Sequence, residues 1–445
     1  MLAKLEKHKR HRFDAKSEKV KPKASNDNKL GGKRGTYKKR ADYSHLDREI
    51  KEIDLPESAK YCHCGSLMKC VGYDTSEVLS FQPSKLFVVE ERRLKYVCTN
   101  HSIKTALAPA RISPKVLISD ELLAELVIAK CLDRQPHYHI QKRYSSRYNT
   151  MLPRDNISRW FIHLAEKVQP IYNLMLDKIS YYDIASIDAT KLQVLKEDNR
   201  ALQTSSKAWV VVNEQVVLFK YSTKSNKTID DLLLGFEGYL HGDADTCYKH
   251  LKHKMVYCNA HSKRHYEPIF KKAKDGIAEH VINTYQRLYQ IEDKVRDLDP
   301  QTIKNIRQQE AKPIWDEFKI YLEENLPKIP PKSNLADAVG YTLRYYEGLT
   351  TYLTDGRLYI DNNHTERIIR QFVLARNNFM FADTVKGAES LCIHFSIIQT
   401  AILNGVEPYD YYCKLFQELP HCQTVDDYEK LLPWNMNNLE SQKVS

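Results

Sequence analysis

The stretch "YYDIASIDA", residues 181–189, decides the fold of this 445-residue chain. It combines aromatic and β-branched residues and ends beside an acid, Asp188, which predicts a buried strand. Two further apolar runs follow, "KAWVVV" and "QVVLFKYS", separated only by the polar pair "NE". This spacing predicts a β-hairpin, so three strands come in succession.

The next segments extend the same sheet. "TIDDLLLGF" predicts a capped helix from Thr228, "EGYLHGDAD" a short strand that reaches Asp243, "DTCYKHLKH" a brief helix and "KMVYCNA" another strand. The order β, β, β, α, β, α, β is that of a ribonuclease H-like mixed sheet, an α/β fold. Because the first and fourth strands of such a sheet are neighbours, we expect Asp188 and Asp243 to meet at their ends.

A third acid lies far along the chain in "YIDNNHTERIIR", residues 359–370. One interpretation is that Asn363 caps a helix and that Glu366, three residues on, closes a capping box. The other is that Glu366 joins the two aspartates as a metal ligand. Clustered carboxylates repel one another unless cations lie between them, and their oxygens suit Mg²⁺ or Mn²⁺. Two such ions would support phosphoryl transfer on nucleic acid.

The charge of the chain is concentrated at its start. The formal net charge is +11, and residues 1–43 hold 15 Lys and Arg against 5 Asp and Glu, an excess of 10. This segment is poor in large apolar residues, so we expect it to be disordered in isolation. Contact with a nucleic-acid backbone and a merely solvated tail are both consistent with this charge.

Soft metal ligands gather after the tail. Cys62, Cys64, Cys98 and His101 flank short alternating runs, as the knuckles of a zinc ribbon would. The alternative is a set of free buried cysteines. The chain has neither the apolar core of a secretion signal nor a long apolar run, which predicts an intracellular protein without a membrane span.

Helical patterns fill the regions on both sides of the predicted sheet. Ser119 and Asp120 are cap candidates for a first helix, and a second is predicted after Pro153. Their basic faces suit a helix-turn-helix-like DNA contact, although an ordinary solvated connector fits equally well. A long charged helical block precedes Glu366 and is interpreted as an insertion into the sheet domain.

These residues resemble a known family. "IDATKLQVL", "YLHGDADTCY" and "GRLYIDNNHTERIIRQFVLARNNFMF" are similar to the three catalytic blocks of the transposases of insertion sequence 66 (TnpC type), members of the DDE transposase group. "CHCGSLMKCVGYDTSEVLSFQPSKLFVVEERRLKYVC" resembles the zinc-finger-like module of that family, and "LLAELVIAKCLDRQPHYHIQKR" its helical DNA-binding segment. The resemblance covers residues 12–412.

The resemblance implies a role for each matching residue. The catalytic acids and ligands of Mg²⁺ or Mn²⁺ would be Asp188, Asp243 and Glu366. "CNAHSKRHY" matches a Cys-x-x-His element, in which Cys258 and His261 are structural or bind a second metal. The neighbouring polar residues would hold Glu366 in place (Asn362 and Asn363) or bind DNA phosphate (Arg367, Arg370 and Arg376).

The predicted function is therefore that of a DNA transposase. It would cut the 3′ strand ends at the terminal inverted repeats of its mobile element and join them to target DNA. A homo-oligomer on DNA, companion proteins of the same element and a nucleoid-associated location in the bacterial cytoplasm are expected. One alternative is a catalytically silent DNA-binding regulator or decayed copy, and another is a structure-selective nuclease on the same fold.

The predicted domains follow the changes of pattern along the chain. They are a basic tail (1–43), a zinc-ribbon-like β module (44–112), a helical DNA-binding segment (113–175), a ribonuclease H-like catalytic domain (176–415) with a helical insertion at about 262–345, and a C-terminal tail (416–445).

Overall fold

Contacts within the chain divide it into two units, Met1–Gln82 and Pro83–Ser445. The computed structural model describes parts of the second unit: residues 85–97, 103–114, 116–197, 205–223, 225–244, 246–248 and 250–436. The predicted basic tail and the candidate zinc ligands Cys62, Cys64, Cys98 and His101 lie outside the described residues.

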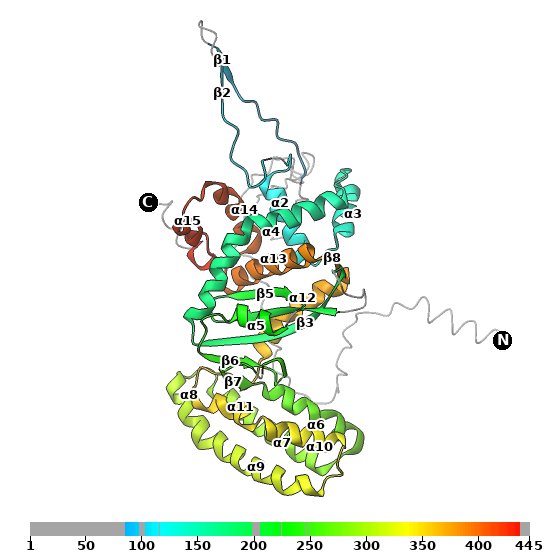
Figure 1. Ribbon diagram of the computed structural model, residues 1–445, viewed down its shortest axis with the longest axis vertical. Helices are drawn as coiled ribbons and strands as arrows, with labels where there is room; N and C mark the ends of the chain where they lie inside the picture. The colour runs from blue at the N-terminus through cyan, green and yellow to red at the C-terminus, as the bar shows by residue number, and fades with distance from the viewer. Residues whose placement is uncertain are drawn as a thin grey trace, which may run out of the picture. The chain divides into compact units, whose positions relative to one another are not determined.

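A mixed sheet forms the centre of the described unit (Figure 1). Its strands run in the order β5-β4-β3-β6-β7, in which β3, β4 and β5 pair antiparallel while β6 and β7 run parallel to β3. The predicted pairing of the first and fourth strands is confirmed, because Ser186 of β3 is opposite His241 of β6. The bounds are β3 Ile184–Lys196, β4 Ser205–Val212, β5 Val217–Ser222, β6 Tyr239–Gly242 and β7 Lys254–Tyr257, and β8 Phe381–Thr384 pairs with the end of β3.

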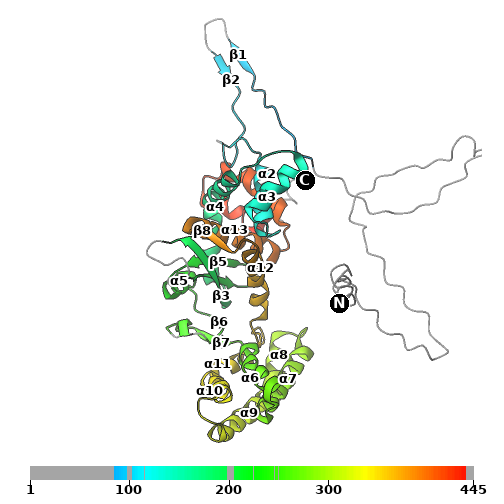
Figure 2. The same cartoon turned by 90° about the vertical axis from the view of Figure 1, so that its right-hand side faces the viewer.

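Helices cover both faces of this sheet (Figures 1 and 2). On one face, aromatic rings join the sheet to two helices: Phe219 stacks on Phe372 with ring centres 5.1 Å apart, and Phe372 lies 5.0 Å from Phe395. On the other face, Trp209 meets Tyr248 edge to face. The helices of the first face are α4 Arg154–Asp177, α12 Asn363–Phe379 and α13 Val385–Leu403, and those of the second are α5 Ser225–Leu232 and the 3₁₀ turn η3 Thr246–Tyr248.

Helix α13 also satisfies hydrogen-bonding groups of the edge strand β5. The hydroxyl of Thr400 accepts from the backbone N–H of Val217 and donates to its carbonyl, both at 3.0 Å. The hydroxyl of Ser396 accepts from the N–H of Phe219 at 2.7 Å. An uncovered edge would offer these groups to another chain, so the two side chains, one helical turn apart, close the sheet on this side.

The helical block between β7 and α12 has a core of its own. The buried ring of Tyr285 meets the buried rings of Trp315 and Phe318 edge to face, and Arg307 pairs with Glu292 in the same block. The block is formed by α6 Asn259–Ala273, α7 Gly276–Val295, α8 Pro300–Ile306, the π-helical η4 Arg307–Ala311, α9 Lys312–Asn325, η5 Leu326–Lys328, α10 Asn334–Arg344, α11 Tyr346–Thr350 and η6 Thr351–Thr354.

The described segments before the sheet form two paired strands and three helices, the last of which is α4. Ser119 caps the first helix by accepting from the N–H of Leu122 at 3.3 Å, and α4 begins directly after Pro153, so both predicted helix starts are confirmed. The elements are β1 Lys95–Val97, β2 Ile103–Thr105, α2 Asp120–Cys131 and α3 His137–Tyr148, and the 3₁₀ turn η2 Lys178–Tyr181 links α4 to β3.

The C-terminal residues pack more closely than the prediction of a tail from residue 416 implied. Leu431, Leu432 and Met436 are buried and join the same core as the sheet. The elements are α14 Pro408–Glu418, η7 Leu419–His421, α15 Val425–Lys430 and η8 Pro433–Asn435.

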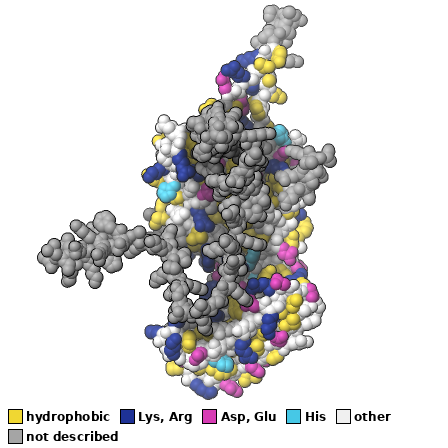
Figure 3. Space-filling view, turned by 180° about the vertical axis from the view of Figure 1, so that it is seen from behind, with side chains coloured by type: hydrophobic (Ala, Val, Ile, Leu, Met, Phe, Trp, Pro, Cys, Tyr) yellow, Lys and Arg dark blue, Asp and Glu magenta, His cyan; other side chains and the backbone are white. Residues whose placement is uncertain are grey.

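Basic and acidic side chains are mixed on the surface of the described residues. Figure 3 shows both kinds interspersed over the helical block. This agrees with a chain whose excess positive charge lies almost wholly in its first 43 residues. Among the described residues, no helix is long and apolar enough to cross a lipid bilayer.

Candidate active site

The two predicted aspartates lie on or beside neighbouring strands. Asp243 directly follows the end of β6, whereas Asp188 lies within β3, which continues to Lys196, so the prediction of a strand end is wrong for Asp188. Ser186 and His241 are directly paired across the parallel strands β3 and β6. Asp188 and Asp243 each come two residues later, so the alternation of side chains places both on the same face of the sheet. Asp188 shares that face with Val210, its partner on β4, and with Phe219, and so faces α12.

The environment of Asp188 resists a negative charge. Burial raises the pKa of Asp188 to about 6, and the nearby carboxylates of Asp243 and Glu366 raise it as well. The backbone N–H of Ala189 opposes this by donating to Oδ1 of Asp188 at 2.7 Å. The three acids therefore lie close enough together for their charges to interact.

Glu366 comes from the first turn of α12, but not as part of a capping box. The helix begins after Asn362, which makes no side-chain capping bond, and the backbone N–H of Glu366 donates to the carbonyl of Asn362. The capping interpretation is therefore wrong for Asn363 and Glu366. The Glu366 side chain is instead turned toward Arg264 of α6 and is 18% exposed.

Asp243, Cys258 and His261 form a compact cluster. One ligand atom from each lies within 4.8 Å of the other two. Nδ1 of His261 is 2.7 Å from Oδ1 of Asp243, yet both atoms are buried without a hydrogen-bond partner of suitable direction. Cys258 is the N-cap of α6, and its Sγ accepts the N–H of Asn362 at 3.2 Å, which ties the cluster to the start of α12.

Two opposing effects act on the pKa of the His261 imidazole. Burial alone would lower the pKa of His261, but contact with Asp243 and Cys258 outweighs burial and raises this pKa to about 10. Nη1 of Arg264 lies 2.9 Å from Nε2 of the same ring. The ring therefore lies between the guanidinium of Arg264 on one side and the carboxylate of Asp243 on the other.

The donor set fits a divalent cation. The carboxylates of Asp243 and Glu366 lie near enough to raise the pKa of Asp188, and Oδ1 of Asp243 is buried and poorly paired. Clustered carboxylate oxygens of this kind are what a site for a hard cation offers. The Cys258 thiol and the His261 imidazole would suit a softer ion. Asp243 belongs to both sets of ligands.

The predicted neighbours of Glu366 occupy different environments. Asn362 is buried, with 3% exposure, behind the acids. Asn363 is partly exposed and donates from its side chain to Oδ2 of Asp361 at 2.6 Å, and Asp361 in turn accepts from the hydroxyl of Tyr289 at 2.9 Å. These bonds join Asn363 to the residues just before α12, and none of them reaches Glu366.

The three predicted phosphate-binding arginines also differ. Arg367 and Arg370 are exposed on the first half of α12. Arg376 donates to the hydroxyl of Thr190 at 3.0 Å and to the carbonyl of Lys191, both on β3. Arg376 thus fastens α12 to the sheet, which leaves Arg367 and Arg370 as the exposed cations of the set.

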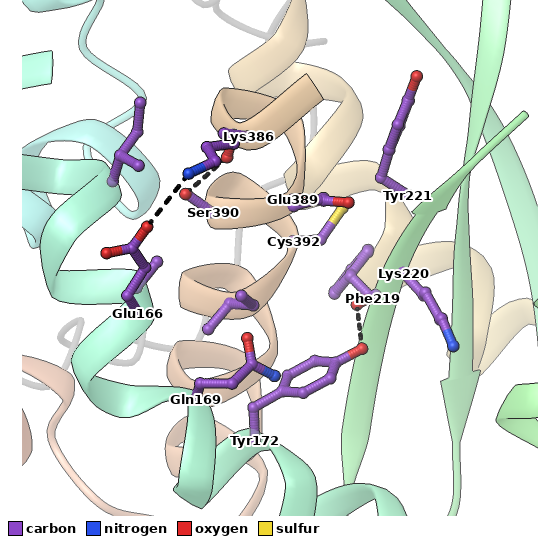
Figure 4. A pocket seen from close by; sticks show the side chains of 13 residues that line it. Glu166, Gln169, Tyr172, Phe219, Lys220, Tyr221, Lys386, Glu389, Ser390 and Cys392 are labelled. Atoms are coloured by element: carbon purple, nitrogen blue, oxygen red, sulfur yellow. Dashed lines mark hydrogen bonds and ion pairs between the residues drawn. The ribbon is translucent and has the colours of Figure 1, made fainter. Parts of the chain in front are cut away.

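A separate pocket lies between α4, β5 and α13 (Figure 4). Glu166 and Lys386 point toward one another across it at 3.7 Å, and Tyr172 donates to the carbonyl of Phe219 at 3.0 Å. None of the predicted catalytic acids lines it. Its polar groups bond to one another where α4 packs against α13 and against β5.

Sequence reasoning missed Arg264. It follows His261 by three residues on α6, so both side chains lie on one face of the helix. That spacing was the only available signal, because the partner of Arg264 is Glu366, 102 residues further on.

Comparison with known families gives matches along most of the chain. Residues 115–390 match the family described as "Transposase IS66 family", residues 396–434 match the "IS66 C-terminal element", and residues 59–100 match the "zinc-finger binding domain of transposase IS66".

Two curated proteins of Sinorhizobium fredii (strain NBRC 101917 / NGR234) are similar over nearly the whole chain. "Uncharacterized protein y4jD" is 27% identical over 93% of this chain and 86% of its own length. "Uncharacterized protein y4qI" is also 27% identical, over 88% of this chain and 76% of its own length.

Proposed function

Because the chain belongs to the IS66 family of transposases, we propose that it cuts and joins DNA strands through Asp188, Asp243 and Glu366. The observation that supports this proposal is the meeting of Asp188 on β3 with Asp243, which directly follows the parallel neighbour β6, while Glu366 is near enough to affect the pKa of Asp188. Three acids from distant parts of the sequence have no structural reason to share one site, since their mutual repulsion is destabilising.

We further propose that the sheet domain is ribonuclease H-like. The strand order β5-β4-β3-β6-β7, with the first three strands antiparallel and the next two parallel to β3, supports this assignment. The helical block between β7 and α12 would then be an insertion that separates Glu366 from the aspartates in sequence only.

The three acids would hold Mg²⁺ or Mn²⁺. Bound ions would supply Lewis-acid activation of the attacking water or 3′-hydroxyl and would stabilise the leaving oxygen. Asp188 and Asp243, fixed on rigid strands, would set the position of the site, while Glu366 would complete it from α12. For Cys258 and His261 we propose a structural role, because Cys258 already binds the start of α12 and His261 orients Asp243.

The remaining parts would bind DNA. Arg367 and Arg370 are exposed on the helix that carries Glu366, where phosphates of a bound strand would pass. The zinc-finger match at residues 59–100 implies a further DNA contact, with zinc held by Cys62, Cys64, Cys98 and His101. The helical segment 113–175, assembly as a homo-oligomer on element ends and the use of companion proteins remain parts of the proposal.

A cleavage assay on DNA carrying the element's terminal repeats tests the catalytic assignment. Asp188→Asn, Asp243→Asn and Glu366→Gln should each reduce Mg²⁺-dependent cleavage by about 100-fold or more, because each removes a ligand charge. Asp297→Asn, at an exposed acid of the helical block, is the matched control and should cut normally.

The same assay separates the alternatives. If all three variants cut as well as the wild type, the assignment of the acids is wrong. End binding that survives EDTA, without cleavage under any metal, would indicate a non-cutting regulator. Cleavage without strand joining would indicate a nuclease.

A further inference from the structure

Two cationic or proton-donating side chains from one helix engage two of the three acids. His261 approaches Asp243 at 2.7 Å, and Arg264, three residues later on α6, reaches Glu366. Nη2 of Arg264 lies 2.9 Å from Oε2 and 3.1 Å from Oε1 of that carboxylate. Its other terminal nitrogen, Nη1, contacts His261.

The ion pair with Arg264 involves both oxygens of the Glu366 carboxylate. Both carboxylate oxygens lie within hydrogen-bond distance of one guanidinium nitrogen, so a divalent ion that takes Glu366 as a ligand competes with Arg264 for this carboxylate. We propose that Arg264 is a built-in cation that neutralises Glu366 in the resting protein and moves to a DNA phosphate when divalent ions and DNA bind. The proposal rests on the proposed function, because it assumes that Glu366 is a metal ligand.

The exposure of the two side chains supports such a movement. Arg264 is 47% exposed, whereas Glu366 is 18% exposed. The arginine therefore reaches into the site from the solvent side, where a nucleic-acid strand would lie. A planar guanidinium matches phosphate oxygens as well as it matches a carboxylate, so the same group can serve both states.

Helix α6 does not depend on this ion pair for its position. The side chain of Asn259 donates to the carbonyls of Leu349 and Ile360, each at 3.0 Å. The hydroxyl of Tyr266 donates to the carbonyl of Ala338 at 2.9 Å, and Ser262 meets Thr342 at 3.0 Å. These contacts are buried, so removal of the Arg264 charge should leave the helix in place.

The decisive variant is Arg264→Gln, which keeps a hydrogen-bonding amide on a shorter side chain but removes the charge. Without DNA, we expect it to bind Mn²⁺ about 3- to 10-fold more tightly, since the ion no longer competes with a partly exposed ion pair. In Ca²⁺, which supports DNA binding without turnover, its DNA affinity should fall, and the slope of log affinity against log salt should decrease by about 1. Electron paramagnetic resonance of free Mn²⁺ and a fluorescence titration of labelled DNA measure the two effects.

Lys271→Gln provides the matched control. It removes one exposed positive charge from the last turn of the same helix. Any gain in Mn²⁺ affinity from the general loss of positive charge will appear in both variants. The effect of the Arg264 contact itself is the excess of the gain in Arg264→Gln over the gain in Lys271→Gln. In the double variant Arg264→Gln with Glu366→Gln the excess should disappear, because the competition acts through Glu366.

The outcomes distinguish this inference from the proposed function. If Arg264→Gln binds Mn²⁺ no better than Lys271→Gln, while Glu366→Gln loses cleavage, Arg264 is not the competing cation and only this inference fails. If Glu366→Gln retains both Mn²⁺ binding and cleavage, Glu366 is not a metal ligand, and the proposed function itself is wrong. Unchanged unfolding midpoints by circular dichroism will show that each variant is folded.

Discussion

The side-chain amide of Asn362 donates to the backbone carbonyl of Ile187 at 3.3 Å, across 175 residues of sequence. Ile187 directly precedes Asp188, and the backbone N–H of Asn362 reaches Cys258 of α6. One buried residue therefore joins β3, α6 and α12, which carry Asp188, Arg264 and Glu366.

Replacement of Asn362 should loosen this junction. Asn362→Ala leaves a buried carbonyl unpaired, and we expect a loss of about 1–3 kcal/mol in the free energy of unfolding. It should also weaken Mn²⁺ binding by about 10-fold or more, since the ligands lose their common support. Asn363→Ala is the control, because its partner Asp361 is only partly buried. Equal effects of both substitutions on Mn²⁺ binding would contradict the assigned role of Asn362.

The raised pKa of Asp188 predicts a pH-dependent stability. A carboxyl whose folded pKa is about 6, against about 4 when unfolded, favours the folded state when protonated. Its contribution is complete below about pH 4 and is lost as the pH rises through about 6. Asp188→Asn mimics the protonated form, so in metal-free protein it should stabilise the fold by up to about 3 kcal/mol at pH 7.5 and have almost no effect at pH 4.

Denaturant unfolding of both proteins in EDTA at the two pH values measures this difference. Other acids titrate over the same range, but they do so in both proteins and cancel in the comparison. A stabilisation of equal size at both pH values would mean that Asp188 has an ordinary pKa, and the electrostatic account of the site would lose its support.

The hydrogen bonds between α13 and the edge strand β5 lead to a prediction about stability alone. Thr400→Val removes the hydroxyl that pairs with both backbone groups of Val217, so two buried polar groups lose their partner. We expect a loss of about 1–3 kcal/mol in the free energy of unfolding. Thr354→Val removes an exposed hydroxyl whose partner water can replace, and it should stay within about 0.5 kcal/mol of the wild type. Similar losses for both would show that closing the edge contributes little.

The sequence predicted the sheet and the approach of its two aspartates because both follow from local patterns and a fixed order of strands. It failed where distant residues compete with a local motif. Asn363 and Glu366 have the spacing of a capping box, yet Arg264 draws Glu366 away and Asp361 takes Asn363. Arg376 bonds to β3, which the sequence did not indicate, and its predicted contact with DNA phosphate stays a prediction. In each case the side chain is positioned by a partner that only folding brings close, so the local sequence does not reveal the contact.

The contact between the helical block and the sheet can be tested with two glycines. A Cβ on Gly348 of α11 would lie 2.2 Å from a ring carbon of Tyr257 on β7, and that ring is packed edge to face against Tyr345. Gly348→Ala must therefore push α11 from the sheet, at a cost of about 1–3 kcal/mol.

Gly340, within α10, has no atom within 4 Å of the position that its Cβ would take, so Gly340→Ala should stabilise the protein by about 0.5–1 kcal/mol through helix propensity. Chemical unfolding of the two variants should thus give changes of opposite sign. A neutral or stabilising Gly348→Ala would mean that Tyr257 is not wedged between β7 and α11, and that the block is held to the sheet by other contacts.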